Sequence, residues 1–133
     1  MPVNGRVIFL ADDDIEDREI IEETLLKLDP TANIQKVTNG QQAVDYLSSC
    51  PENDLPCLII LDYKMPMLNA VEVLERINQM SRFDDVPKVV WSTSRQPEHV
   101  QQCLDNGAIT YYVKPYSNSD LISMAREMLA LCK

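Results

Sequence analysis

The side chains with the clearest chemical potential in this sequence are carboxylates, hydroxyls and one lysine, each placed at the end of a short apolar run. Three consecutive aspartates, Asp12 to Asp14, follow the first run, and Asp62 follows the third. Ser92 and Lys114 follow two later runs. Grouped carboxylates bind hard cations such as Mg²⁺, which prefers oxygen ligands.

The runs that precede these residues have the length and composition of β-strands. They cover residues 6–11, 33–37, 57–61, 88–91 and 110–113, and they are rich in apolar and β-branched side chains. Between them, apolar residues recur at helical spacing, as in the stripe from Leu121 to Cys132. Ser117 followed by Asp120 is typical of a helix start. We therefore predict five strands alternating with five helices in one α/β domain over residues 1–133.

Strict alternation of strand and helix predicts a parallel sheet with helices on both faces. The third run is apolar throughout and is expected at the centre of the sheet. Ligands of such sheets bind beyond the carboxyl ends of the strands. If the first and third strands are neighbours, Asp12, Asp13 and Asp62 share one acidic pocket, where their mutual repulsion favours a divalent cation.

The composition argues against several other functions. The chain has 12 Lys+Arg against 21 Asp+Glu and a formal net charge of -9, so nucleic acid and anionic membranes are not expected partners. The amino-terminal segment resembles neither a signal peptide nor a membrane span, which predicts a cytoplasmic protein. The single histidine and the absence of a C-x-x-C pair argue against zinc. Mostly buried, reduced thiols without a disulfide are expected at Cys50, Cys57, Cys103 and Cys132.

Several residues near these strand ends have purely structural interpretations. Asp14, Glu16 and Asp17 are expected to cap the first helix and to face water. Packing roles, without a binding surface, are expected for Met65, Met67, Met80 and Trp91.

Four segments together resemble the receiver domains of bacterial response regulators, including the single-domain chemotaxis type. They are Val7–Asp14, Leu58–Pro66 with Asn69-Ala70, Val89–Ser94 and Tyr111–Pro115, in the order and spacing of that family. The resemblance covers essentially the whole chain. It implies a flavodoxin-like three-layer sandwich whose parallel five-stranded sheet has the strand order 2-1-3-4-5.

The resemblance also assigns the phosphoacceptor and the metal ligands. Asp62 receives the phosphoryl group. Mg²⁺ is held by Asp13, by Asp62 and by the main-chain carbonyl of Lys64, and Asp12 reaches the ion through water. The Ser92 hydroxyl is expected to bind a phosphoryl oxygen.

The same resemblance assigns further roles, and the sequence departs from the family's usual residues at two positions. Lys114 is expected to bind phosphoryl oxygens, and Tyr111 takes the aromatic switch position that responds to Ser92. The Lys114-Pro115 bond is a candidate cis peptide. Ser92 stands where threonine is usual, and Ala70 stands where the family usually has a glycine suited to positive φ, so the loop at Ala70 is expected to be reshaped.

These assignments predict a stand-alone response regulator in a phosphorelay, without an output domain. It would be a signalling phosphoacceptor with self-phosphorylation and self-dephosphorylation chemistry, and not an enzyme acting on a separate substrate. A sensor histidine kinase or a histidine phosphotransfer protein would donate the phosphoryl group. A downstream protein target would dock on residues 99–106 and 118–127.

Three other functions share parts of this pattern. A haloacid-dehalogenase-type phosphatase needs a second acid at the position of Lys64. An FMN carrier needs a phosphate-binding loop after its first strand, where this chain is acidic. A phosphorylation-independent adaptor of the same fold remains the alternative, although the acid set is intact.

Overall fold

The computed structural model describes residues 6–132 of the chain, in which strands and helices alternate. The strands are β1 (Val7–Ala11), β2 (Asn33–Val37), β3 (Leu58–Asp62), β4 (Lys88–Ser92) and β5 (Thr110–Val113). The helices are α1 (Ile15–Leu28), α2 (Gly40–Ser49), α3 (Ala70–Ile77), α4 (Pro97–Asp105) and α5 (Asn118–Leu131). Short 3₁₀ turns occupy Glu52–Asp54 and Ser81–Phe83. The predicted alternation is confirmed, and the strand ends differ from the prediction by at most one residue.

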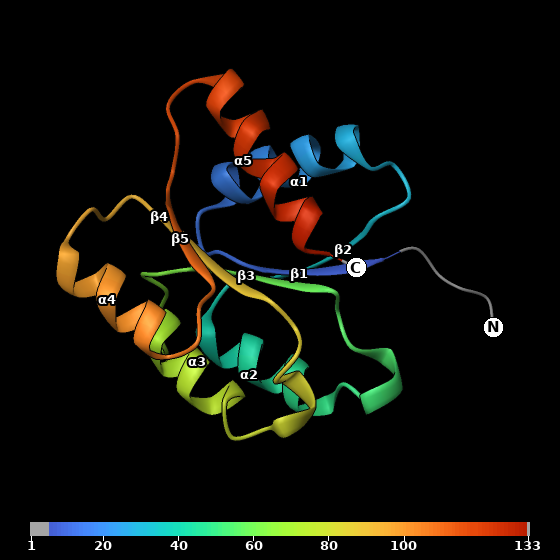
Figure 1. Cartoon of the computed structure of the whole chain (residues 1–133), viewed down its shortest axis with the longest axis vertical. Helices are drawn as coiled ribbons and strands as arrows, with labels where there is room; N and C mark the ends of the chain where they lie inside the picture. Colours follow the sequence, from blue (N-terminus) through green and yellow to red (C-terminus); the bar gives the residue numbers. More distant parts are fainter. Residues whose placement is uncertain (1–5, 133) are drawn as a thin grey trace.

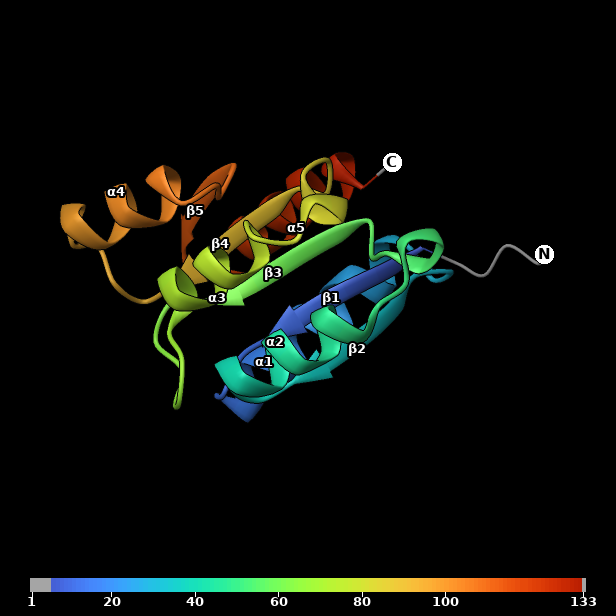
Figure 2. The same cartoon turned by 90° about the horizontal axis from the view of Figure 1, so that it is seen from below.

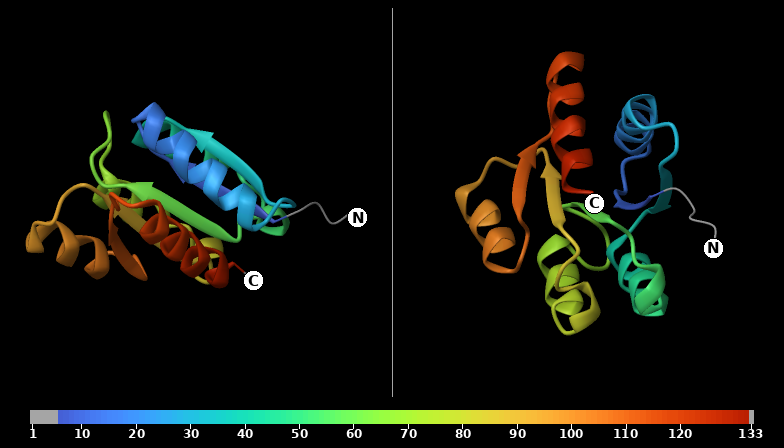
Figure 3. Two further views of the ribbon diagram at one scale, coloured as in Figure 1. Left: turned by 90° about the horizontal axis from the view of Figure 1, so that it is seen from above. Right: turned by 45° about the vertical axis from the view of Figure 1, so that its right-hand side comes forward.

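The five strands form one parallel sheet in the order β2-β1-β3-β4-β5, as predicted. Helices cover both faces (Figure 1). Helices α2 and α3 lie on one face, in front of the sheet in Figure 2, and α1 and α5 lie on the other, in front of it in the left view of Figure 3. Helix α4 lies beside β5 at the edge of the sheet. This is the three-layer flavodoxin-like sandwich.

Alternating side chains of the strands fill two apolar cores, one on each face. Phe9, Ile59 and Leu61 pack toward α2 and α3, whereas Ile60 and Trp91 pack toward α1 and α5. All five residues of β3 are buried, as expected for a central strand. Trp91 is 2% exposed, so its predicted packing role is confirmed.

Four helices begin with a side-chain cap at the carboxyl edge of the sheet. Asp14, Asn39, Asn69 and Ser117 each accept a hydrogen bond from the backbone N–H three residues later. The predicted start at Ser117 is confirmed, because the N–H of Asp120 donates to its hydroxyl over 3.1 Å. These caps fix where each helix leaves the strand ends, and so they shape the site at that edge.

The loop before α3 differs from the expectation in where its unusual backbone lies. Ala70 is the fully buried first residue of α3, and its N–H donates to the carbonyl of Tyr63 over 2.9 Å. The one positive φ at a non-glycine residue within 6–132 is 74° at Met67. Ala70 therefore does not adopt the left-handed backbone conformation for which glycine is favoured. Met65 is buried as predicted, but Met67 is 71% exposed, so its predicted packing role is wrong.

Two further predictions are wrong. The Lys114-Pro115 bond is trans, since residues 6–132 contain no cis peptide bond; trans is the lower-energy form of an X-Pro bond. Cys57 and Cys132 form a disulfide, with their Cα atoms 4.9 Å apart. The fold brings the start of β3 to the end of α5, a proximity that spacing along the chain does not reveal. Cys50 and Cys103 are free and buried as predicted.

No helix in residues 6–132 is long and apolar enough to cross a membrane.

Candidate functional site

The predicted site residues meet at the carboxyl edge of the sheet. Asp12 follows β1, Asp62 and Ser92 are the last residues of β3 and β4, and Lys114 follows β5. Because these four strands are neighbours in the sheet, their ends deliver these side chains to one place. A cavity of about 570 Å³ opens there, lined by Asp13, Asp14, Asp17, Asp62, Lys64, Met65, Pro66, Thr93 and Lys114.

Three carboxylates form the acidic centre of this cavity. One oxygen each of Asp12, Asp13 and Asp62 lies within 4.8 Å of the others. Asp12 is fully buried and Asp62 is 6% exposed, whereas Asp13 is exposed at the rim. The predicted clustering of these acids is confirmed. An all-oxygen donor set with one ligand open to solvent fits Mg²⁺, which keeps part of its hydration shell. Lys64 lines the same cavity, where its main-chain carbonyl was predicted to contribute.

Lys114 is the positive counterpart of these acids. Its ammonium lies 2.8 Å from Asp17, 3.1 Å from Asp12 and 3.3 Å from Asp62. The same ammonium lies 4.7 Å from the centre of the Trp91 ring, which adds a cation–π contact. Burial favours a lower pKa for Lys114, but the hydrogen bond to Asp17 and the charges of Asp62 and Asp12 raise it above its ordinary value. The lysine therefore stays charged.

Asp17 is a residue of this site that the sequence interpretation missed. It was expected to face water as a cap, whereas its carboxylate makes the shortest of the three contacts to Lys114. Asp14 does cap α1, by accepting from the N–H of Asp17 over 3.0 Å. This cap sets the phase of the first turn, and the turn carries Asp17 back over the strand ends. The signal in the sequence is its position in the first turn of the helix that directly follows Asp12 and Asp13.

The carboxyl group of Asp62 is strongly perturbed by its surroundings. Its burial, followed by the charge of Asp12, raises its pKa from 3.8 to about 7, and the charge of Lys114 only partly opposes this shift. Near neutral pH, the metal-free site therefore holds Asp62 partly protonated. A bound divalent cation would favour the anion, which is the form that can attack phosphorus.

The raised pKa of Asp62 predicts a dependence of stability on pH. Because the folded-state pKa lies above the unfolded value, the stability associated with this group is present below about pH 4 and is lost as the pH rises through about 7. In EDTA, Asp62→Asn should therefore gain on the order of 2 kcal/mol over wild type between pH 5 and pH 8. Urea unfolding at several pH values measures this, with the exposed Glu16→Gln as control. Parallel profiles for wild type and Asp62→Asn would contradict the assignment.

The end of β4 is held by a hydrogen-bond network. The buried Ser92 hydroxyl accepts from the N–H of Ser94 over 3.1 Å. The Ser94 hydroxyl lies 2.6 Å from Nδ1 of His99, and the Ser94 carbonyl accepts from the Tyr111 hydroxyl over 2.9 Å. The ring of His99 stacks on Tyr63 with centroids 4.2 Å apart. Tyr111 is thus half-buried and tethered to the loop that follows Ser92.

His99 and Ser94 belong to this network without a clear sequence signal. The histidine lies in α4, and it bridges the loops that follow β3 and β4 through Tyr63 and Ser94. A lone histidine on a short helix does not reveal which loops it touches. Movement at Ser92 can therefore reach α4 through Ser94 as well as through Tyr111.

Comparison with known proteins agrees with this geometry. The sequence model of the response regulator receiver domain matches residues 8–126. The chain belongs to this family. It is 28% identical to the two-component response regulator ARR9 of Arabidopsis thaliana, in a match that covers 92% of this chain and 58% of that protein. The chain thus spans about three fifths of the length of this relative.

Solved structures of receiver domains superimpose on the whole fold. A phosphorylated cyanobacterial phytochrome response regulator, RcpA, has a TM-score of 0.86 and 27% identity, covering 96% of this chain and 94% of its own. The Mn²⁺-bound response regulator Rcp1 has a TM-score of 0.81 and 26% identity, covering 94% and 92%. The family and the fold class predicted from the sequence are confirmed, and the domain is a receiver of two-component signalling.

Proposed function

We propose that this receiver accepts a phosphoryl group on Asp62 from a sensor histidine kinase or a histidine phosphotransfer protein in a Mg²⁺-dependent reaction, and that it signals through a protein contact. The observation that carries the proposal is the convergence of Lys114 on Asp12 and Asp62 beside a third carboxylate, Asp13. A largely buried ammonium and a cluster of carboxylates that can bind a cation lie at one cavity, and together they can provide the charge compensation that phosphoryl transfer needs.

The metal ligands proposed are Asp13, Asp62 and the carbonyl of Lys64, with Asp12 acting through water. When bound, Mg²⁺ would neutralise these carboxylates and bind a phosphoryl oxygen. Lys114 would bind a second phosphoryl oxygen, and the Ser92 hydroxyl would turn from its own loop to bind another. The protein does little covalent chemistry beyond presenting the Asp62 oxygen in line with the donor.

Asp62 is the best placed of the three acids to act as nucleophile. Asp12 is fully buried, and its two oxygens are engaged by the N–H of Asp14 and by Lys114. Asp13 is exposed at the rim and is not one of the three acids that contact Lys114. Asp62 lines the cavity and contacts Lys114, so it combines access from solvent with a cation beside it.

Exposed apolar side chains near the cavity support docking of a phosphodonor protein. Ile15, Met67 and Tyr116 are 59%, 71% and 96% exposed. Each lies in a segment that follows a strand contributing a site residue, so all three belong to the carboxyl edge of the sheet. Apolar groups beside a charged site are a feature of protein interaction surfaces. A histidine-bearing partner could bury them while its phosphohistidine enters the cavity.

The experiment that tests the proposed function is modification of the full chain by acetyl phosphate, or by beryllofluoride, with Mg²⁺. Mass spectrometry of peptides should place the phosphoryl group on Asp62, and EDTA should prevent labelling. Phosphorylation on Asp12 or on Ser92, or no labelling with Mg²⁺ present, would overturn the proposal.

The lifetime of the phosphorylated form should depend on Lys64. Its ammonium can lie beside the phosphoryl group and shield it from water, a surface interaction worth up to about 1 kcal/mol. Lys64→Ala should therefore change the dephosphorylation rate by up to roughly fivefold, with acceleration if shielding dominates. Mg²⁺ affinity should stay nearly constant, because the proposed ligand is a backbone oxygen. Lys36→Ala, on β2 and paired with Glu22, is the control; decay equal to wild type in Lys64→Ala would refute the role.

Phosphorylation should reach the surface through the end of β4. Drawing the Ser92 hydroxyl toward the phosphoryl group would disturb its bond to Ser94, and the Tyr111 tether to the Ser94 carbonyl would then be released. NMR shift mapping with beryllofluoride should show changes in residues 99–106 and 118–127. Changes confined to the loop after Asp62 would mean that the signal leaves by another face.

A further inference from the structure

The disulfide between Cys57 and Cys132 lies at the opposite end of the sheet from the phosphoacceptor. Cys57 immediately precedes β3, about 16 Å along the strand from Asp62, and Cys132 caps the carboxyl end of α5. Both backbones are held in place. The N–H of Cys57 donates to the carbonyl of Val7 over 2.8 Å, and the Arg6 guanidinium donates to the carbonyl of Cys132 over 2.9 Å. The Cα separation of 4.9 Å is within the usual range for a disulfide.

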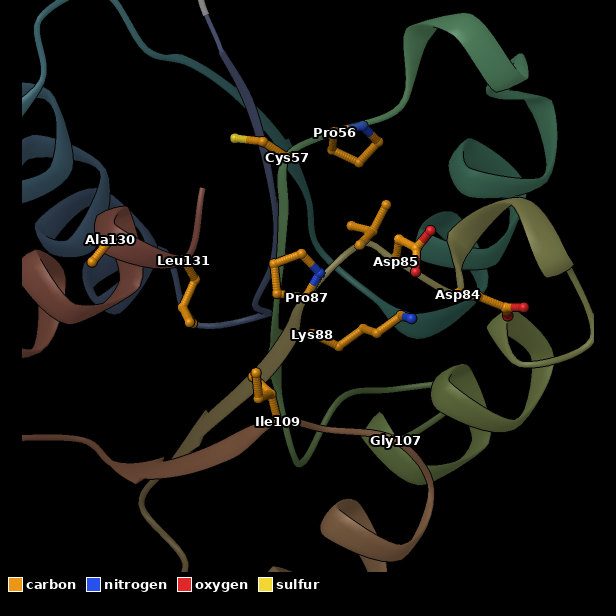
Figure 4. Close-up of a pocket in the computed structure, with 11 residues that line it drawn as sticks. Pro56, Cys57, Asp84, Asp85, Pro87, Lys88, Gly107, Ile109, Ala130 and Leu131 are labelled. Carbon is orange, nitrogen blue, oxygen red and sulfur yellow. The ribbon is translucent and has the colours of Figure 1, made fainter. Parts of the chain in front are cut away.

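A cavity lies beside one of the two cysteines. It has a volume of about 630 Å³, and its walls are largely apolar. Cys57 lies on this cavity beside Pro56, and its sulfur points toward the side on which Ala130 and Leu131 of α5 lie (Figure 4). Cys57 is partly exposed, whereas Cys132 is buried. A thiol reagent entering the cavity therefore meets Cys57 first.

The other two cysteines are poor candidates for thiol chemistry. Burial raises the pKa of the Cys50 thiol, and it raises the pKa of the Cys103 thiol to about 11. Only the thiolate is a good nucleophile, so burial disfavours the reaction of both groups at neutral pH. Of the four cysteines, all of which lie within residues 6–132, Cys57 alone is partly exposed, so reaction with a small disulfide is expected to begin there.

We propose that Cys57 and Cys132 form a reversible redox site, reached from this cavity, whose oxidation fastens the end of α5 to the start of β3. In the oxidising direction, the Cys57 thiolate attacks a low-molecular-weight disulfide such as oxidised glutathione, and one glutathione thiolate leaves. The Cys132 thiolate then attacks the mixed disulfide at Cys57 and displaces the second glutathione. Two protein thiols thus become one disulfide while one oxidised glutathione becomes two thiols.

The consequence is a change in how α5 is anchored. The bond closes a loop between residues 75 positions apart, which restricts the unfolded chain and stabilises the folded one. In the reduced form, α5 is held by its apolar stripe, through residues such as Met124 and Met128, and by the hydrogen bonds from Arg6 to Cys132 and from Tyr112 to Glu127. Reduction of the wild type should lower the midpoint of thermal unfolding by about 10 °C.

The site can be tested by counting thiols in the full chain. After equilibration with oxidised glutathione, unfolding in urea and alkylation with N-ethylmaleimide, the wild type should carry two labels, on Cys50 and Cys103. After reduction it should carry four. Peptide mapping should find residues 57 and 132 joined. Four labels after oxidation, or a disulfide that includes Cys50 or Cys103, would overturn the proposal.

Matched variants separate the pair from the remaining cysteines. Cys132→Ser should retain one glutathione on Cys57, because no second thiol resolves the mixed disulfide, and its unfolding temperature should not respond to reductant. Cys50→Ala should keep both the pair and the response. The measurement on reduced wild type needs no substitution, so it stands even if a variant folds poorly. An unfolding temperature of the wild type that is the same with and without reductant would overturn the anchoring of α5.

Discussion

Asp62→Asn is expected to abolish phosphorylation of this receiver by acetyl phosphate and Mg²⁺. The asparagine amide is a poor nucleophile. Replacing Asp62 also removes one carboxylate from the metal site. The neighbouring acids cannot take over, since Asp12 is buried and engaged by Asp14 and Lys114. Labelling should fall below detection, because no activated nucleophile remains at this position. Intact-mass spectrometry over a time course measures it.

The loss can be separated from damage to the fold. Because Asp62 is buried against like charge, the neutral amide should leave the domain at least as stable as wild type above pH 7. Circular dichroism and urea unfolding check this directly. Asp54→Asn changes an exposed acid in a surface turn and should keep wild-type labelling. Wild-type labelling of Asp62→Asn would show that another residue is the phosphoacceptor.

The sequence could predict the strand ends because burial leaves a strong pattern. β3 is buried on both faces, so it reads as a continuous apolar run that stops at Asp62. β1 and β4 behave similarly, which places Asp12 and Ser92 at the same edge. Parallel pairing then delivers these residues together once strand order is known. The order itself came from the family resemblance, since periodicity does not rank strands within a sheet.

The parts of the site that could not be predicted depend on tertiary geometry. Asp17 contacts Lys114 because the cap at Asp14 fixes the direction in which the side chains of the first turn of α1 point. The rotation of a helix relative to a sheet cannot be predicted from the composition of the sequence. The stacking of His99 on Tyr63 depends on the position of the short helix α4 relative to the loop after β3. The Cys57–Cys132 pair depends on the path of α5 back across the sheet. Each is a contact between distant segments without a periodic signature.

Substitution of Lys114 should have the second largest effect on the reaction. Lys114→Met keeps the length of the side chain and removes its charge, so phosphorylation by acetyl phosphate should slow by about 100- to 1000-fold, the usual loss for one preorganised donor at a developing anion. The three acids would also lose their common cation. Mg²⁺ should consequently bind at least as tightly as in wild type, because the pocket becomes more negative.

These opposite effects can be followed in one molecule through its single tryptophan. The Lys114 ammonium lies over the Trp91 ring, so intrinsic fluorescence should report both the loss of the lysine and the titration with Mg²⁺.

Asp17→Asn is the variant matched to Lys114→Met. It keeps Lys114 charged but removes its nearest carboxylate, and it should slow phosphorylation by less than Lys114→Met while leaving Asp62 as the labelled residue. Glu16→Gln, an exposed acid on the same turn, should change neither property. Phosphorylation of Lys114→Met at the wild-type rate would show that the lysine's contacts with these acids are structural and take no part in transfer.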